Sequence, residues 1–221
     1  MDDEPIRREV AVRRFREMLA MLFLCALVAA GLGVWGAAPT WSELGWGLAL
    51  LVSTTVLPMP LFLAGEVAVN RRRPVIAAAL LASPVGIGEL LRLAVVSWAS
   101  AQAVEAAWIG LWTITLTWAL GEPMLLNALL TGSAEPRQFR QPAGWDSGPL
   151  SPRNVFATLA TISREVGLCL LVAWSPWLVL ATFAALSASG WLLTSGTGRK
   201  RLIDALGGYV ALAAGVALWL M

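Results

Sequence analysis

Arg164 and Glu165 stand side by side inside a long apolar segment of this 221-residue chain. An ionised side chain at the centre of a bilayer costs roughly 2.5–3.5 kcal/mol on insertion scales, so such charges are usually paired, face water or have a function. Neighbours on a helix point about 100° apart and satisfy each other poorly. Glu165 is also about ten residues into its segment, near mid-bilayer depth. We therefore expect Glu165, beside Arg164, to handle protons or ions with partners on other helices or another subunit.

Further charges lie within other apolar segments. Glu89 and Arg92 are three residues apart, which puts both on one face of a helix, where they form either a structural or a functional pair. Glu122 precedes Pro123, and a helix weakened there would leave Glu122 in need of polar partners. Alternatively, Glu122 lies at the membrane interface. The candidate proton path comprises Glu165, Arg164, Glu122, Glu89 and Arg92.

The composition excludes histidine-dependent sites and an unaided iron–sulfur cluster for the chain acting alone. It has no histidine, so it cannot form a bis-histidine haem site, a histidine metal site or a histidine-activated nucleophile. Cys25 and Cys169 both lie in apolar segments, and two thiols do not hold an iron–sulfur cluster unaided. We expect them to be buried as small apolar residues. No catalytic residue, metal or cofactor is therefore assigned to this chain alone.

The predicted fold class is all-α, a polytopic transmembrane bundle. The chain is 58% hydrophobic and 14% charged, whereas soluble domains carry about 25% charged residues. A crossing needs about 20 apolar residues, and about seven stretches qualify. They are 18–38, 44–64, 75–98, 105–130, 155–174, 177–194 and 202–220. A six-crossing alternative keeps 155–194 as one long helix kinked at Ser175-Pro176.

Basic residues occur in alternate connections between these stretches. They precede the first stretch and follow the second, fourth and sixth. Seven crossings put all of them on one side, which the positive-inside rule makes cytoplasmic, with the N-terminus inside. The expected location is a bacterial-type inner membrane. The predicted parts are a leader (1–17), four crossings (18–130), a cytoplasmic loop (131–154) and three crossings (155–221). Acidic residues interleave with arginines in the leader, which favours a solvated amphipathic surface helix over a nucleic-acid site.

Three stretches resemble a known family. Gly144-Trp145-Asp146-Ser147, followed by Ser163-Arg164-Glu165, resembles part of the H-type membrane subunit of respiratory complex I and of its counterpart in energy-converting membrane-bound hydrogenases. In that family a Gly-Trp-x-Ser loop leads into a helix with Ser-Tyr-Glu or, in hydrogenases, Ser-Arg-Glu. Gly65-Glu66 before an Arg-Arg-Arg-Pro run, and Arg199-Lys200-Arg201-Leu202-Ile203-Asp204, are similar to further loops of the family in the same order. The resemblance covers roughly half of the chain and leaves an extra N-terminal helix.

The resemblance implies a non-catalytic membrane subunit that anchors a soluble redox arm, contacts other membrane subunits and carries part of a proton path. Its candidate docking residues are Glu66, Arg71, Arg72, Arg73, Trp145, Asp146 and Ser147. The family's acidic cytoplasmic loop and the amphipathic Gly-Leu-Leu-Gln helix of its quinone tunnel have no counterpart here, which leaves quinone contact in doubt. The redox reaction itself would belong to partner subunits.

Two other functions stay open. A small solute or ion transporter would place its site at the intramembrane charges, and Pro58, Pro60 and Ser83-Pro84 are candidate helix breaks for such a site. A transporter would also be expected to show internal repeats, and none is recognisable. A purely structural scaffold protein would use the many Ala and Gly residues for close helix packing.

Overall fold

A computed structural model describes residues 4–36, 38–56, 59–71, 74–99, 102–132, 151–193 and 198–221. Every regular element in these ranges is helical. In chain order the elements are α1 (Glu4–Trp35), α2 (Trp41–Leu51), the π-helix η1 (Val52–Val56), α3 (Met59–Asn70), α4 (Pro74–Ala99), α5 (Ala103–Leu116), the π-helix η2 (Thr117–Gly121), α6 (Glu122–Leu130), α7 (Pro152–Trp174), α8 (Leu178–Leu193) and α9 (Gly198–Leu220).

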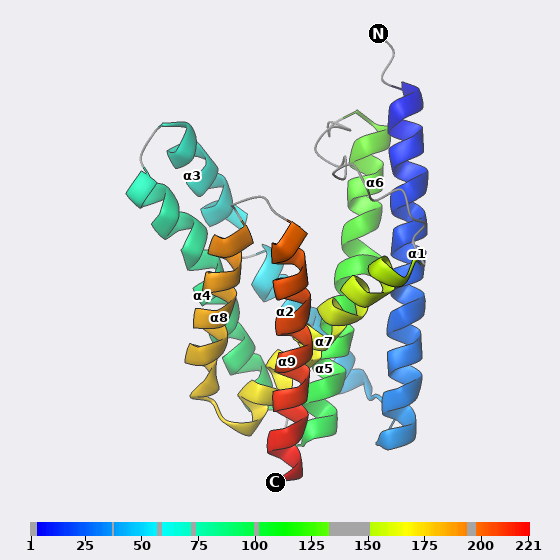
Figure 1. Cartoon of the computed structure of the whole chain (residues 1–221), viewed down its shortest axis with the longest axis vertical. Coiled ribbons are helices and arrows are strands. Elements are labelled where there is room, and N and C mark those ends of the chain that lie inside the picture. The colour runs from blue at the N-terminus through cyan, green and yellow to red at the C-terminus, as the bar shows by residue number, and fades with distance from the viewer. Residues whose placement is uncertain are drawn as a thin grey trace.

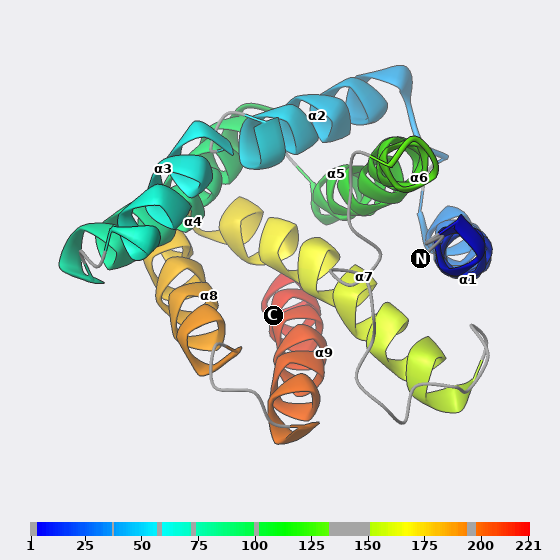
Figure 2. The same cartoon turned by 90° about the horizontal axis from the view of Figure 1, so that it is seen from above.

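The helices run up and down along the long axis of the molecule. The N-terminus, the end of α3, the start of α4 and the end of α6 lie at one end, and the C-terminus lies at the other, while α9 begins nearer the middle (Figure 1). Seen from above, α1 stands at one edge beside α6, while α7 crosses the middle obliquely (Figure 2). Helix α7 packs against α5 on one side and α9 on the other, and its C-terminal half reaches α4 and α8.

Helix α1 joins the predicted leader to the first predicted crossing. It runs without interruption from Glu4 to Trp35, so the leader from residue 4 onward and the first predicted crossing form one helix. No Gly or Pro lies between residues 6 and 30 to end the helix. At 1.5 Å per residue it is about 48 Å long, more than the ~30 Å hydrocarbon layer. Its first turns therefore extend beyond a bilayer that surrounds its apolar part.

The predicted crossing over 44–64 is divided into α2, η1 and α3. Thr40 and Glu43 form a reciprocal capping box that starts α2. Where α2 ends, two side-chain hydroxyls bond to one backbone carbonyl. Ser53 and Thr54 both donate to the Leu50 carbonyl, at 3.0 and 2.7 Å, and so compete with backbone amides for this acceptor. The π-helical turn that follows is a common form of local widening in a helix.

A second π-helix, η2, lies just before Pro123, where the sequence predicted that the helix would be weakened. Proline removes an amide donor and clashes with the carbonyl one turn earlier, and η2 widens the backbone at that turn. The helix therefore continues from α5 into α6 instead of breaking. Helix α4 passes Pro84 as an uninterrupted α-helix, so the predicted break at Ser83-Pro84 is absent.

Three helices are long and apolar enough to cross a membrane within the described ranges, compared with about seven predicted crossings. They are Ile6–Val34, Ala103–Leu130 and Asn154–Trp174; a shorter apolar helix covers Ala205–Leu220. In the most apolar 18-residue part of Ile6–Val34, only 22% is buried inside the protein. Large apolar side chains, such as Phe23 and Val210, point outward. Such long, outward-facing apolar helices indicate a membrane protein.

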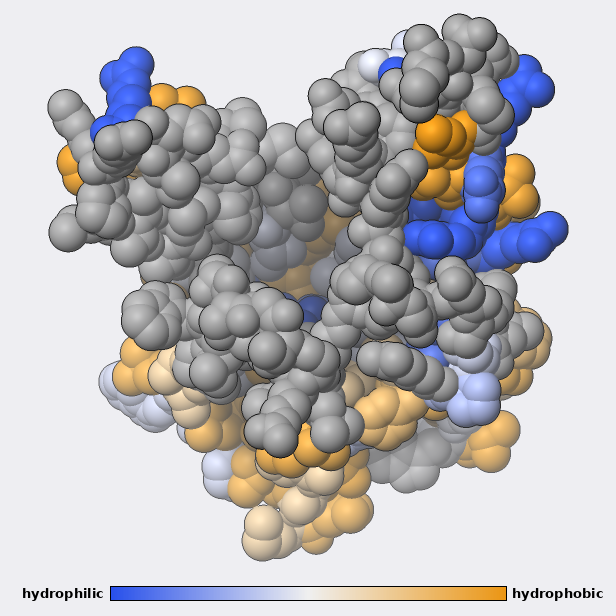
Figure 3. Space-filling view, turned by 45° about the horizontal axis from the view of Figure 1, so that its top comes forward, coloured by the Kyte–Doolittle hydropathy of each residue, from blue (hydrophilic) through white to orange (hydrophobic). Residues whose placement is uncertain are grey.

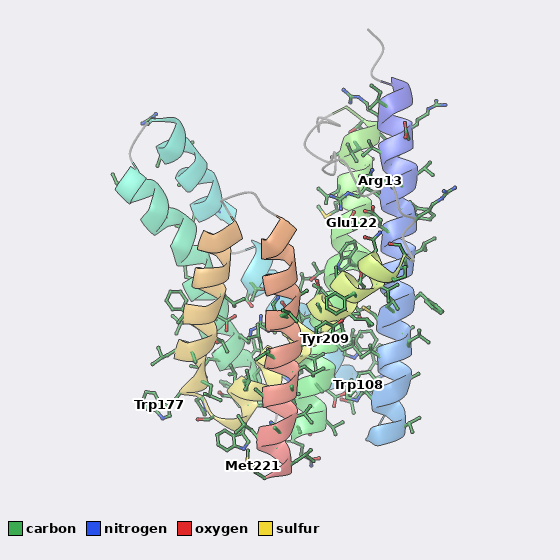
Figure 4. All side chains as sticks on the ribbon, viewed as in Figure 1. Arg13, Trp108, Glu122, Trp177, Tyr209 and Met221 are labelled. Atoms are coloured by element: carbon green, nitrogen blue, oxygen red, sulfur yellow. The ribbon has the colours of Figure 1, made fainter. Side chains whose placement is uncertain are left out.

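The α7–α9 contact brings two helix backbones close together. A Cβ added at Gly167 would meet the α9 backbone at Ala211 and Leu212, and one added at Gly208 would meet the Ala160 carbonyl oxygen of α7. The Tyr209 hydroxyl, labelled in Figure 4, donates to the Phe156 carbonyl at 2.9 Å. Small residues at these positions therefore fix α9 on α7.

Candidate functional site

Arg92 of α4 is the centre of a charge cluster formed by α4, α7 and α8. Its Nε donates to Glu89 Oε1 at 3.1 Å, and its Nη2 donates to Glu165 Oε2 at 2.9 Å. Its third nitrogen, Nη1, lies 3.4 Å from the Cys169 sulfur. Each guanidinium nitrogen therefore has a partner, and one arginine bridges two carboxylates on different helices. Glu89, Arg92, Arg164, Glu165, Cys169 and Thr182 are called the Arg92 cluster below.

Helical spacing brings the members into reach. Glu89 and Arg92 share a face of α4 because they are three residues apart. Glu165 and Cys169 are four apart on α7, so both can meet Arg92 on successive turns. Gly110 of α5 packs behind this part of α7, since an added Cβ would lie 2.8 Å from the Glu165 carbonyl oxygen. The close approach at Gly110 therefore helps to hold the Glu165 backbone in place.

Burial decreases across the cluster. The side chains of Glu89 and Arg92 are 4% and 6% exposed, that of Glu165 is 15% exposed, and that of Arg164 is 30% exposed. Arg164 Nε is 3.4 Å from Glu165 Oε1, longer than the Arg92 contact. This agrees with the expectation that adjacent residues satisfy each other poorly. The partner that Glu165 needed on another helix is Arg92.

Two members of the Arg92 cluster, Thr182 and Cys169, were not predicted from the sequence as site residues. The Thr182 hydroxyl of α8 lies 2.7 Å from Glu89 Oε2 and can donate to it. Cys169 was expected only as a buried apolar residue; it is fully buried and also receives the Arg92 contact. No spacing rule links Thr182 with Glu89, 93 positions away. The only available signal was the buried carboxylate itself, which requires hydrogen-bond donors.

In the Arg92 cluster, one guanidinium group is shared between two carboxylates. Two carboxylates and two guanidinium groups balance when all four are ionised. A proton placed on Glu165 would displace one arginine contact, while Arg92 would keep Glu89 as its counter-ion. Neutralising one carboxylate therefore leaves no isolated cation at Arg92, which an ordinary buried ion pair cannot avoid.

The remaining predicted residues lie elsewhere. Glu122 pairs with Arg14 of α1 at 3.2 Å, outside the Arg92 cluster. Arg71 is exposed at the turn after α3. The backbone of Glu66 belongs to α3, but its side chain lies outside the described part of the structure. The other predicted docking residues, Arg72, Arg73, Trp145, Asp146 and Ser147, also lie outside it.

The described residues contain no group of three or more His, Cys, Asp or Glu that could hold a metal ion. Comparison with known proteins gives no family for the chain: no family model matches it, and no curated protein or solved structure is significantly similar to it.

Thr182→Val should destabilise the protein by about 1.5–3 kcal/mol, because the isosteric change removes a hydroxyl that donates to a buried carboxylate. Thermal unfolding in a fixed detergent measures the effect. Thr161→Val is the matched control, because the Thr161 hydroxyl bonds to the Ala157 carbonyl within its own helix. We expect this control to stay within about 0.5 kcal/mol of wild type. Equal effects of the two changes would show that the bond to Glu89 contributes little.

Proposed function

We propose that this chain is a non-catalytic integral membrane subunit of a complex I-like or membrane-bound hydrogenase-like redox complex, and that the Arg92 cluster carries part of its proton path. The observation that carries the proposal is Arg92, which bridges Glu89 and Glu165 between helices α4 and α7. The Ser163-Arg164-Glu165 triplet, which resembles the hydrogenase form of the family motif, lies at this cluster.

The geometry supports proton handling for a physical reason. Ionisable groups within apolar segments of a membrane protein are costly, and they commonly mark proton or ion pathways. Here the polar groups form a continuous sequence from the Thr182 hydroxyl through Glu89, Arg92 and Glu165 to the partly exposed Arg164. A proton that reaches Glu165 therefore arrives at a group connected to both a buried and a more exposed end.

We further propose seven crossings with the N-terminus on the cytoplasmic side. The elements alternate in direction along the long axis (Figure 1). Hydrophilic side chains gather over the N-terminal part of α1, and Arg71 is exposed directly after α3, whereas the opposite end is mainly hydrophobic (Figure 3). Helix α9 runs away from the end that holds the N-terminus, and its first turn contains Arg199, Lys200 and Arg201, so the positive-inside rule supports this orientation.

Glu165→Gln tests the proton role. We expect coupled proton movement by the intact complex in sealed vesicles to fall by about tenfold, because the amide cannot exchange a proton while Glu89 keeps part of the path. A pH-sensitive dye inside the vesicles measures it. Glu9→Gln is the control, since Glu9 is an exposed carboxylate on α1, and it should leave the rate unchanged. An unchanged rate in Glu165→Gln would leave the cluster with a structural role.

The partner prediction is tested by purifying the tagged full chain in a mild detergent and identifying co-purifying proteins by mass spectrometry. We expect hydrogenase-like or complex I-like membrane subunits together with a soluble redox arm. Recovery of the chain alone, as a monodisperse species, would contradict membership in a redox complex.

One observation favours a transporter as the second candidate. Two neighbouring stretches, α2–η1–α3 and α5–η2–α6, are each interrupted by a π-helix, and interrupted helices form the sites of many transporters. They touch closely, since an added Cβ at Gly47 of α2 would meet Trp112 of α5. Solute-dependent stabilisation of the chain purified alone would favour this function over a role in a redox complex.

A further inference from the structure

Glu122 is a buried carboxylate whose two oxygens have different surroundings. It is the first residue of α6, directly after the π-helix η2. Its Oε1 accepts a hydrogen bond from Arg14 Nη1 of α1 at 3.2 Å, and the side chain is 10% exposed. Its Oε2 is buried without a hydrogen-bond partner among the described residues. Figure 4 shows Glu122 between α6 and α1. Half of this carboxylate is therefore unsatisfied.

The backbone beside Glu122 has one hydrogen-bond donor fewer than a regular helix. Residue 123 is proline and has no amide hydrogen, so one carbonyl of the preceding turn lacks the helical donor that it would otherwise have. Side chains on a helix lean toward the turn that precedes them. The Glu122 side chain is therefore expected to lean toward the turn from which Pro123 removes a donor. A proton on Oε2 would give that carbonyl a donor.

The neighbouring charges can accommodate both protonation states. Helix α6 packs against α1 and η2, and η2 contains no charged residue. On α1, Arg14 faces Glu122, Arg13 pairs with Glu17 at 3.5 Å, and Arg7 donates to the Leu129 carbonyl at 3.5 Å. Glu17 lies three residues after Arg14, a spacing that allows the two to pair. If Glu122 became neutral, Arg14 would still have a carboxylate within reach.

We propose that Glu122 is a second proton-binding site, separate from the Arg92 cluster. In one state the carboxylate is ionised and paired with Arg14. In the other it has taken up one proton from water on Oε2, donates that proton to the carbonyl left free by Pro123, and releases Arg14 to Glu17. The site sits where α1 is held on α6, so its protonation alters the contact between these two helices. The proposal does not require a redox complex.

The test uses the purified full chain in lipid nanodiscs and infrared difference spectroscopy during acidification. A buried carboxyl that takes up a proton gives a C=O stretching band. We expect a band that is lost in Glu122→Gln and kept in Glu165→Gln. In Arg14→Gln the ionised state has lost its cation, so the band should be present before acidification. Glu122→Asp, which keeps the carboxyl on a shorter side chain, should shift the band without removing it.

The possible results distinguish protonation of Glu122 from protonation of the Arg92 cluster. Carboxyl bands unchanged in Glu122→Gln would overturn the inference, and so would the loss of the same band in Glu165→Gln, because the titrating group would then belong to the Arg92 cluster. A different band that is lost only in Glu165→Gln would belong to the proposed function and would leave the inference standing. Circular dichroism and gel filtration check that Glu122→Gln is folded. If it is not, the band shift in Glu122→Asp decides, and an unshifted band would overturn the inference.

Discussion

Arg92→Gln should lower the free energy of unfolding by about 3–5 kcal/mol, because it leaves Glu89 and Glu165 buried without their shared cation. A neutral amide can donate to one of the two carboxylates but cannot balance their charge. For a chain of this size, the loss corresponds to a fall of roughly 6–20 °C in the unfolding temperature. Thermal unfolding of the purified protein at a fixed detergent concentration provides the measurement.

Two further variants identify the cause of this loss. Arg71→Gln makes the same chemical change at the exposed turn after α3 and should alter stability by less than about 0.5 kcal/mol. The triple variant Glu89→Gln, Arg92→Gln, Glu165→Gln removes all three charges and should recover most of the stability, since replacing a whole buried ionic group is often neutral. If Arg92→Gln were as mild as Arg71→Gln, the cluster would not be a desolvated site.

Gly208→Val should cost at least about 3 kcal/mol, the second large effect expected. An added Cβ at Gly208 would collide with the Ala160 carbonyl oxygen of α7, and a backbone atom cannot rotate away as a side chain can. The two γ-methyl groups of valine increase the collision. Helix α9 must therefore move off α7, and this also disturbs the helix that contains Glu165. Thermal unfolding and the fraction of monodisperse protein in gel filtration measure the effect.

Gly207→Ala is the matched control for this prediction. Gly207 is the adjacent residue on α9, and an added Cβ there would meet nothing within 4 Å. Alanine is preferred over glycine in a helix by about 0.8–1.0 kcal/mol, so this variant should be as stable as wild type or slightly more stable. Equal loss in both variants would show that the effect comes from the glycine backbone and not from the α7–α9 contact.

Local spacing predicted the parts of the Arg92 cluster but not the whole. Glu89 and Arg92 are three residues apart, so their pairing follows from helix geometry. Glu165 was expected to need a partner on another helix, because Arg164 points elsewhere. That partner is Arg92, 73 positions away in the sequence. A spacing rule cannot identify such a pair, since it depends on how α4 and α7 cross.

The interrupted helices show a similar limit. The apolar stretches at 44–64 and 105–130 were predicted as crossings, and Pro123 was expected to weaken the second. Whether a helix breaks, bends or widens at a proline depends on what the freed backbone groups and nearby hydroxyls can bond. Both stretches contain a π-helix, and the second continues through it from α5 into α6. Pro84, by contrast, leaves α4 uninterrupted.

The sequence alone determined that the chain is helical and suited to a membrane, and that several charges lie within apolar segments. These properties follow from composition and local periodicity, which each segment carries by itself. Only the tertiary structure decided that Glu165 shares Arg92 with Glu89, that Thr182 completes this group, and that Arg14 pairs with Glu122. Those contacts join distant segments, and they depend on close approaches at glycines such as Gly110, where backbones meet without an intervening side chain.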